Sequence, residues 1–489
     1  MRYSIEKEYS MGKMQWKNLL CKERARETGT KYLPFRNEFE KDYERIITSS
    51  SLRRLQDKAQ VFPLQENDFT RTRLTHSLEV SSIARSLGKR IGYNLCQKGY
   101  MNETEAEELT SMLAVCGLVH DLGNPPFGHY GEDIIKSWFD EHKDDFKDIG
   151  DKLDDFRCFD GNAQTIRILS KLQYLKDGFG INFCYGTLGT LLKYPKSSHD
   201  VIHLDKISKR KIGYFQSEKI IFENIVNKTG MKDSETGEIL RHPATYLLEA
   251  ADDIAYLFAD LEDAVKKDYA IWEKIKQDIL SVTNTLDNFK FIQLEIAKME
   301  ETNDNRLPIK DCVALEASYL KVLCQGKCIE LVCNEFIENY ESIMDGKYFE
   351  ETQRKSLCDA PTICNIVGEC ADGTKGIVRR DCTQYAYENS EVLSLELIAK
   401  TVLVSLLDRF TKAAISKDRE DKRTENGKLY SKISKNFILM QKFDGNGEYD
   451  EHKKVEEYGH LQSAIDYIAG MTDSYALNLH KILEGMKLP

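Results

Sequence analysis

Three short segments of this 489-residue chain carry histidine and aspartate within otherwise apolar sequence. They contain His76, the adjacent pair His120 and Asp121, and the adjacent pair Asp252 and Asp253. Imidazole and carboxylate groups together suit divalent Mn, Fe, Zn or Mg rather than a metal bound by soft thiolates. A buried aspartate pair is costly unless at least one carboxylate is paired or bound to metal. The residue types therefore predict one divalent metal site, to which all three segments contribute.

Helices are expected to position these side chains. Apolar residues follow the first histidine at the spacing of one helix face: His76, Val80, Ile83, Leu87 and Ile91. The same spacing leads to the second histidine through Leu109, Met112, Cys116 and His120. A third helix is predicted over 244–265, where Asp252 and Tyr256 lie one turn apart, opposite an aliphatic seam. Both histidines are therefore predicted to face the protein interior.

The loop after Asp121 offers a second kind of chemistry. Its prolines and glycines restrict the backbone, and His129 and Glu132 follow where the next helix is expected to begin. On a helix these two side chains share a face, and the carboxylate would raise the basicity of the imidazole. Histidine titrates near neutral pH, as general acid–base catalysis requires. A helix-capping loop with a surface histidine is the alternative, and the spacing alone leaves both interpretations open.

The rest of the chain is predicted to be mainly α. Further helical patterns run over 42–60, 311–343, 391–416 and 459–486, whereas 178–200 is rich in glycine and is expected to form turns with short extended pieces. No apolar run is long enough to cross a membrane and no secretory signal is recognised, so we expect a cytoplasmic protein. The net charge of −11 excludes a molecule built to wrap nucleic acid, although a local basic pocket is compatible with it.

The thirteen cysteines suggest a structural metal only weakly. Two groups stand close in sequence, namely Cys324, Cys328 and Cys333, and Cys358, Cys364 and Cys370. Their spacings are not the paired Cys-x2-Cys of zinc ribbons. We therefore expect free, buried thiols in the segment 312–382.

Several longer motifs closely resemble those of the bacterial dGTPases, which are deoxynucleoside triphosphate triphosphohydrolases of the HD superfamily. The motifs that contain the candidate ligands are TRLTHSLEV (72–80), HDLGNPPFGH (120–129) and EAADDIAY (249–256). Further matching segments are RRLQDKAQVFPL (53–64), FDGNAQ (159–164), LGTLLKYP (188–195) and DYIAGMTD (466–473). The resemblance spans nearly the whole chain, except 265–345 and 417–457.

The resemblance implies a fold and an activity. The fold would be an HD-domain helical bundle over 1–270, with a helical C-terminal region over 271–489 packed on it. The activity would be hydrolysis of dGTP, and of other dNTPs if they fit, between the α-phosphorus and the 5′-oxygen. The products would be a deoxynucleoside and intact triphosphate, with Mn or Mg as the metal. Relatives form homo-oligomers, often hexamers, and some bind single-stranded DNA.

The resemblance also implies roles for individual residues. The metal ligands would be His76, His120, Asp121 and Asp252, the last chosen over Asp253 because the family's substrate-contacting tyrosine follows its metal aspartate by four residues, as Tyr256 does. His129, supported by Glu132, would be the catalytic histidine. Gln60 would contact the 3′-hydroxyl and Arg73 a phosphate. Lys193, Tyr194 and Lys211 are further candidate phosphate contacts, because they lie in turn-rich or basic segments.

Two other functions stay open at this point. One is an HD phosphohydrolase of nucleoside monophosphates or cyclic nucleotides, which would not need the set Gln60, Arg73 and Tyr256. The other is a non-catalytic regulator that binds nucleotides or single-stranded DNA, which loss of a metal ligand would favour. Gln60, Arg73 and Tyr256 are all present, and so are the four candidate metal ligands. A P-loop is excluded. In the nearest match, Gly368 … Gly373-Thr374-Lys375, the threonine precedes the lysine instead of following it, and the segment precedes no strand–helix unit.

Overall fold

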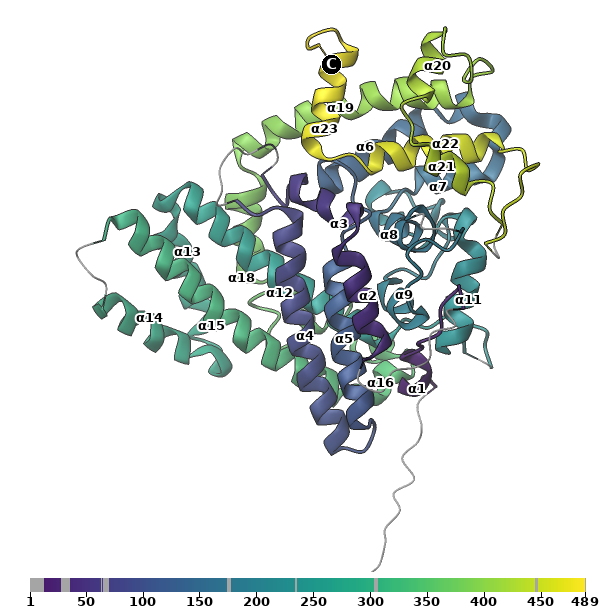
Figure 1. Cartoon of the computed structure of the whole chain (residues 1–489). Helices are drawn as coiled ribbons and strands as arrows, with labels where there is room; N and C mark the ends of the chain where they lie inside the picture. Colours follow the sequence, from purple (N-terminus) through teal and green to yellow (C-terminus); the bar gives the residue numbers. More distant parts are fainter. Residues whose placement is uncertain are drawn as a thin grey trace, which may run out of the picture.

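Helices supply the regular secondary structure of this protein (Figure 1). The structure is a computed structural model, and it describes residues 13–27, 36–62, 64, 70–173, 177–233, 235–302, 307–444 and 447–488. Within these residues the chain forms 23 α-helices and no sheet, only isolated bridges such as Ala59–Thr72. The prediction of a mainly α protein is therefore confirmed.

The first half of the chain contains α1–α12. Their bounds are Trp16–Leu19, Glu38–Ile47, Ser50–Arg54, Arg73–Gln97, Glu103–Val119, Gly128–Glu141, Asp154–Arg157, Gly161–Arg167, Tyr185–Leu191, Ser198–Val201, Lys219–Thr229 and Pro243–Lys267. A π-helical turn, Ile168–Leu172, extends α8.

The second half contains α13–α23. Their bounds are Trp272–Thr283, Phe291–Thr302, Ile309–Glu338, Tyr340–Met344, Tyr348–Thr352, Ile377–Asp381, Ser390–Ile415, Glu425–Tyr430, Lys435–Met440, Glu457–Ala469 and Asp473–Leu483. None of the helices in the described part of the chain combines the length and the apolar character that crossing a membrane would need.

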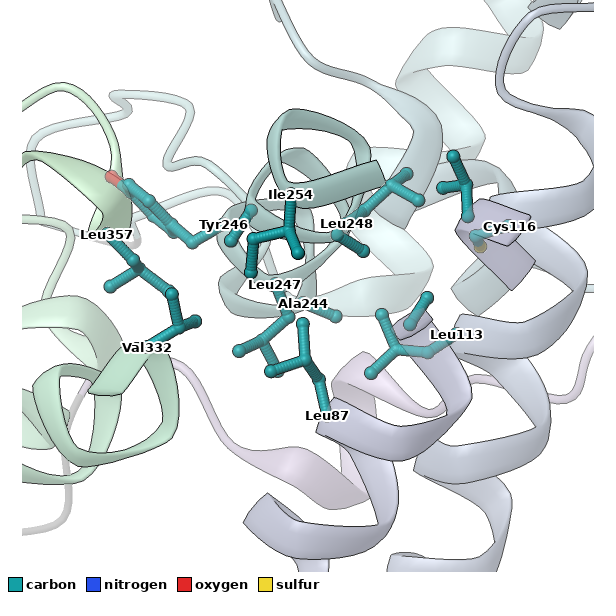
Figure 2. Close-up of a cluster of buried hydrophobic side chains, with 14 of the residues drawn as sticks. Leu87, Leu113, Cys116, Ala244, Tyr246, Leu247, Leu248, Ile254, Val332 and Leu357 are labelled. Carbon is teal, nitrogen blue, oxygen red and sulfur yellow. The ribbon is translucent and has the colours of Figure 1, made fainter. Parts of the chain in front are cut away.

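The main hydrophobic core lies between α4, α5, α12 and α15. Figure 2 shows side chains from all four helices in one cluster, among them Leu87 of α4, Leu113 of α5, Leu247 of α12 and Val332 of α15. Glycine lets α4 and α5 approach closely, since a Cβ atom on Gly117 would lie 2.7 Å from Cα of Ser81. This close packing brings the helices that carry the two predicted histidine ligands together.

A second core joins α6 to the C-terminal helices α19, α22 and α23. Figure 1 shows α19 crossing the same end of the molecule as α22 and α6. The segment 271–489 therefore contributes to both cores, because α15 packs on α12 and α4 while α19 packs on α6. The division of the chain at residue 270 stays a prediction.

Three local predictions from the sequence need correction. The pattern over 42–60 is not one helix, because α2 ends at Ile47 and Ser49 caps a new helix, α3, by accepting a hydrogen bond from the Leu52 amide. Residues 185–191 form a buried helix, α9, rather than turns and extended pieces. Its glycines serve packing, since a Cβ atom on Gly186 would lie 2.8 Å from the Leu19 carbonyl oxygen. The pattern over 459–486 is broken at 470–472 into α22 and α23.

The expectation of free thiols in the segment 312–382 is wrong for two of its eight cysteines. Cys364 and Cys370 form a disulfide, with their Cα atoms 5.2 Å apart. The backbone between them turns back on itself, because the Gly368 amide donates a hydrogen bond to the Cys364 carbonyl oxygen at 3.1 Å. The other cysteines are free, and most of them are buried.

Candidate metal centre and active site

Three helices deliver the predicted ligands to one place. α4 begins at Arg73 because Thr72 caps it. The Thr72 hydroxyl accepts a hydrogen bond from the Thr75 amide, and the Thr75 hydroxyl accepts one from the Thr72 amide. His76 therefore lies in the first turn of α4. His120 directly follows α5, where the chain turns toward Pro125. Asp252 lies within α12, which starts at Pro243.

The four side chains form a compact cluster. Nε2 of His76 lies 3.1 Å from Oδ1 of Asp252 and 4.0 Å from Oδ2 of Asp121. Nε2 of His120 lies 3.5 Å from both carboxylates. Side-chain ligand atoms of His76, His120 and Asp121 lie within 4.8 Å of one another. These are separations at which one ion can be bound by all four groups.

Hydrogen bonds outside the cluster leave ligand atoms unpaired within it. Nδ1 of His120 lies 2.8 Å from the Gly117 carbonyl oxygen, to which it donates its proton, so Nε2 is the nitrogen that can bind a metal. That Nε2 atom is buried and has no hydrogen-bond partner among the described residues. Oδ1 of Asp121 accepts a hydrogen bond from the Asn124 side chain at 2.8 Å, which fixes the carboxylate. Two imidazoles and two carboxylates with such support fit a divalent metal ion.

The charges in the cluster fit a cation as well. Burial lowers the pKa of His120, but the carboxylates of Asp121 and Asp252 outweigh burial and raise it to about 9. Burial raises the pKa of Asp121, yet the neighbouring cations, first His120 and then Arg73, bring it down to about 2. The pKa of Asp252 is also held well below its usual range, because its neighbours His120 and His76 outweigh burial. Both carboxylates thus attract positive charge, and a metal ion and protons would compete for the same ligand atoms.

Asp253 has a different environment from its neighbour Asp252. Its Oδ1 atom lies 3.2 Å from Nη2 of Arg379, and its other oxygen accepts a long hydrogen bond from Ser356. Burial raises the pKa of Asp253 to about 6, against the opposing effect of Arg379. The geometry therefore places Asp252, and not Asp253, beside the two histidines.

A cavity of about 580 Å³ opens onto the cluster, a size that suits a small-molecule ligand. Three cationic side chains line it, namely Arg73, Lys193 and Arg379. Nη1 of Arg73 lies 2.5 Å from Oδ2 of Asp121, and the Nε atom of Arg73 is buried with no partner among the described residues. Each of these cations is held by one carboxylate and keeps further donors for an anion.

His129 enters the same cavity from the start of α6. Its side chain is 77% exposed, and Nδ1 lies 3.6 Å from Oε2 of Glu132. Glu132 is buried and accepts hydrogen bonds from the Gly161 amide at 2.9 Å and from Lys211 at 3.1 Å. Burial raises the pKa of Glu132, but Lys211, His129 and Lys136 outweigh burial and hold it well below its usual range. An ionised carboxylate thus supports one side of the imidazole, and the other side is free for substrate.

Tyr256 of α12 also lines the cavity, together with the polar side chains of Gln60, Asp260 and Tyr387. Oε1 of Gln60 is buried without a partner among the described residues, and so is Oδ1 of Asp260. The other oxygen of Asp260 accepts a hydrogen bond from the Tyr387 hydroxyl at 2.7 Å. Burial raises the pKa of Asp260 to about 8.

The structure brings most of the predicted site residues into this one cavity. Those that line it are Gln60, Arg73, His76, Asp121, His129, Lys193, Asp252 and Tyr256. His120 and Glu132 lie behind it, in contact with lining residues. Lys211 does not line the cavity, because Glu132 and Asp160 hold its ammonium group. Tyr194 does not line it either, and its ring lies under the Lys193 ammonium, 5.7 Å from the ring centroid.

The cavity residues that the sequence did not predict include Asp260, Arg379 and Tyr387. Asp260 follows Tyr256 by one helix turn, so extending the polar stripe of α12 would have found it. Arg379 and Tyr387 lie on either side of Cys382, where no periodic pattern indicates which side chains point inward. Their place in the cavity depends on the packing of α18 and of the π-helical turn Cys382–Tyr387 against α12, which no local sequence pattern encodes.

Comparison with known proteins gives full-length matches. The HD domain model matches residues 73–169, and the phosphohydrolase-associated domain model matches residues 376–482. A "deoxyguanosinetriphosphate triphosphohydrolase-like protein" of Listeria monocytogenes is 36% identical, over 97% of this chain and 100% of the relative. One of Pseudomonas aeruginosa is 31% identical with the same coverage. A "deoxyguanosinetriphosphate triphosphohydrolase" of Yersinia enterocolitica is 28% identical, over 91% of this chain and 93% of the relative.

Proposed function

This chain belongs to the deoxyguanosinetriphosphate triphosphohydrolase-like family of HD-domain phosphohydrolases, and from that premise we propose that it hydrolyses dGTP to deoxyguanosine and inorganic triphosphate. One observation carries the proposal. The four candidate metal ligands, His129 and three cationic side chains lie together around one cavity. A triphosphate ester needs all three of these features, because its charge must be neutralised while water attacks and an alkoxide leaves.

The metal would be held by His76, His120, Asp121 and Asp252. A divalent ion there supplies an activated water and neutralises charge on the phosphoryl oxygens. We propose Mn or Mg as that ion, because half of the ligand set is carboxylate and the substrate adds hard phosphate oxygens.

The cations of the cavity would bind and orient the triphosphate. Arg73 lies beside Asp121, so its free Nε donor would contact the phosphate nearest the metal. Lys193 and Arg379 line the same cavity and would contact the remaining phosphates. Lys211 has another role in this proposal, since it keeps Glu132 ionised behind His129. Tyr194 would act through Lys193, whose ammonium lies above its ring.

His129 would protonate the leaving 5′-oxygen. Glu132 contacts Nδ1, so that Nε2 is the nitrogen that faces substrate. Protonating the leaving group makes cleavage of the bond between phosphorus and the 5′-oxygen easier and releases the deoxynucleoside. The intact triphosphate then leaves from the cationic part of the cavity.

Gln60, Tyr256 and Asp260 would recognise the deoxyribose. The unpaired Oε1 of Gln60 would accept a hydrogen bond from the 3′-hydroxyl, and Oδ1 of Asp260, protonated at neutral pH, would donate one to it. Tyr256 would pack against the sugar and leave no room for a 2′-hydroxyl, which disfavours ribonucleotides. The preference for guanine among the bases is proposed from the names of the relatives.

We also propose that the protein forms a homo-oligomer. α19 supports this, because it presents exposed apolar side chains next to the cavity, namely Leu393, Leu397 and Ile398. A second copy would cover them. Light scattering on a sizing column measures the mass of the particle in solution, which gives the number of subunits.

The function is tested by separating the products formed from each dNTP in the presence of Mn or Mg. Deoxynucleoside and triphosphate in equal amounts, fastest from dGTP, support the proposal. Parallel reactions with dGMP and with cyclic nucleotides test the alternative phosphohydrolase. Turnover of those compounds but not of dGTP would replace the proposed substrate, and no turnover of any of them would indicate a binding protein.

A further inference from the structure

Asp473 joins two loops of the active site that are far apart in sequence. It is the first residue of α23 and is 2% exposed. Its Oδ2 atom accepts a hydrogen bond from the amide of Ala59, next to Gln60, at 2.9 Å. Its Oδ1 atom accepts one from the amide of Phe127, two residues before His129, also at 2.9 Å. A single buried carboxylate thus uses both oxygens on backbone amides beside proposed substrate-binding and catalytic residues.

The second of these amides belongs to an unusual piece of backbone. Phe127 has φ of 63°, in the left-handed region that residues with a Cβ atom rarely adopt. Gly128 follows with φ of 62° and lies against the guanidinium of Arg73, so that a Cβ atom there would collide with it. A non-glycine residue stays in this conformation only when its surroundings fix it. The hydrogen bond from Phe127 to Asp473 is such a constraint, and it sets the direction in which α6 presents His129.

Lys58 strengthens the connection. Its ammonium is buried and donates hydrogen bonds to the carbonyl oxygens of Asn124 and Ala469. One of these lies in the loop after Asp121, and the other at the end of α22. Burial lowers the pKa of Lys58 to about 7, while the charge of Asp473 opposes that shift. Lys58 and Asp473 therefore fasten the same three segments, around 58–60, 124–128 and 469–473.

We propose that Asp473 is a positioning residue for the reaction: it holds the Gln60 loop and the first turn of α6 so that Gln60 and His129 face the substrate together. This inference rests on the proposed function for its kinetic readout. Residue 473 lies in the phosphohydrolase-associated region. The inference therefore gives that region a direct part in building the active site. Asp473 itself touches neither substrate nor metal in this proposal.

Asp473→Asn is the first test, because it preserves shape but replaces one of the two acceptors by a donor. Thr472→Ala is the matched control. It removes the side-chain oxygen that caps α23 at the Tyr475 amide and leaves the carboxylate of Asp473 in place. A displacement of about 1 Å at a catalytic group costs up to about 100-fold in rate. We therefore expect kcat of Asp473→Asn to fall by about 10- to 100-fold, and kcat of Thr472→Ala to stay near wild type.

Two kinetic comparisons separate positioning from general loss of structure. In a His129→Ala background, Asp473→Asn should lower kcat little further, because the residue acts through His129. In the same background it should still weaken the preference for dGTP over 2′,3′-dideoxy-GTP, which depends on Gln60. Asp473→Glu, which restores a carboxylate, should recover part of both losses. Equal losses in Asp473→Asn and Thr472→Ala, or additive losses with His129→Ala, would overturn the inference.

Hydrogen exchange provides a readout that needs no activity. Peptides covering 56–60 and 124–131 should exchange faster in Asp473→Asn than in wild type, while peptides from α4 and α12 should not change. If both segments keep wild-type protection in Asp473→Asn, the inference is wrong. If exchange changes as expected but the wild-type protein hydrolyses no dNTP, the proposed function fails and the structural role of Asp473 stands.

Discussion

Nε2 of His76 and Oδ1 of Asp252 lie 3.1 Å apart, although they belong to α4 and α12, two helices far apart in the sequence. The contact exists because both helices contribute to the main core, where Leu87 of α4 and Leu247 of α12 pack in the same cluster. His120 completes the arrangement from the end of α5. The candidate metal centre is thus a consequence of how three core helices pack.

The adjacent aspartates of α12 give a matched pair for testing the metal site. Asp252→Asn should remove most bound Mn and most activity, because a neutral amide is a poor ligand and the site loses one negative charge. Asp253→Asn should keep the metal, since Asp253 contacts Arg379 instead. Metal analysis after dialysis, with circular dichroism to check folding, measures both. Loss of metal in Asp253→Asn alone would show that the wrong aspartate has been assigned.

His129 is expected to act on protons without binding the metal. His129→Ala should lower kcat by about 10²- to 10⁴-fold, the usual effect of removing a general acid or base. Bound metal should be unchanged. Glu132→Gln should cause a smaller loss, because the imidazole remains but loses its ionised neighbour. His129→Ala with wild-type kcat, or with reduced metal content, would contradict this role.

The sequence predicted the clustering of the candidate metal ligands better than the surroundings of that cluster. His76 and His120 could be assigned to inner helix faces because they continue regular apolar patterns, and the helices are present over the expected ranges. Lys211 shows the opposite case. From the sequence, a lysine in a basic segment indicates only that some anion lies nearby. In the structure the anion next to Lys211 is the buried carboxylate of Glu132.

Contacts between distant segments could not be predicted from local patterns. Asp473 lies in a motif that the sequence analysis singled out, yet nothing near it in sequence indicates that its carboxylate binds the amides of Ala59 and Phe127. Arg379 likewise reaches the cavity only through the packing of α18 against α12. Residues with local periodicity could be placed, and those that depend on tertiary contacts could not.

The sugar contacts predict a dependence on the 3′-hydroxyl. Gln60→Ala should lower kcat/KM for dGTP by about 2- to 10-fold, the range of a neutral hydrogen bond. It should hardly change kcat/KM for 2′,3′-dideoxy-GTP, which lacks the hydroxyl. GTP should be a poor substrate of the wild-type enzyme and a better one of Tyr256→Ala. Comparable kcat/KM for GTP and dGTP in wild type would rule out the proposed role of Tyr256.

Asp260 predicts a pH dependence of stability. Its pKa is about 8 in the folded protein, against about 4 for an unfolded aspartate. Between these values the folded state binds more protons than the unfolded state, so stability falls as pH rises, by at most about 1.4 kcal/mol per pH unit. Above pH 8 this contribution is constant. Asp260→Asn should lack it.

Denaturation by urea at several pH values measures the difference. The free energy of unfolding of wild type should decrease relative to Asp260→Asn from about pH 4 to about pH 8. Tyr387→Phe should move the upper limit to higher pH, because the hydroxyl of Tyr387 stabilises the carboxylate. Parallel curves for wild type and Asp260→Asn would contradict the raised pKa.

The most direct test of the central claim is to identify the bond that is broken. Purified protein is incubated with dGTP and Mn in water enriched in ¹⁸O, and the products are separated and weighed by mass spectrometry. The account predicts unlabelled deoxyguanosine and triphosphate carrying one ¹⁸O atom, because water attacks the α-phosphorus and the 5′-oxygen leaves with the nucleoside. Formation of dGMP with pyrophosphate, of dGDP with phosphate, or of labelled deoxyguanosine would contradict it.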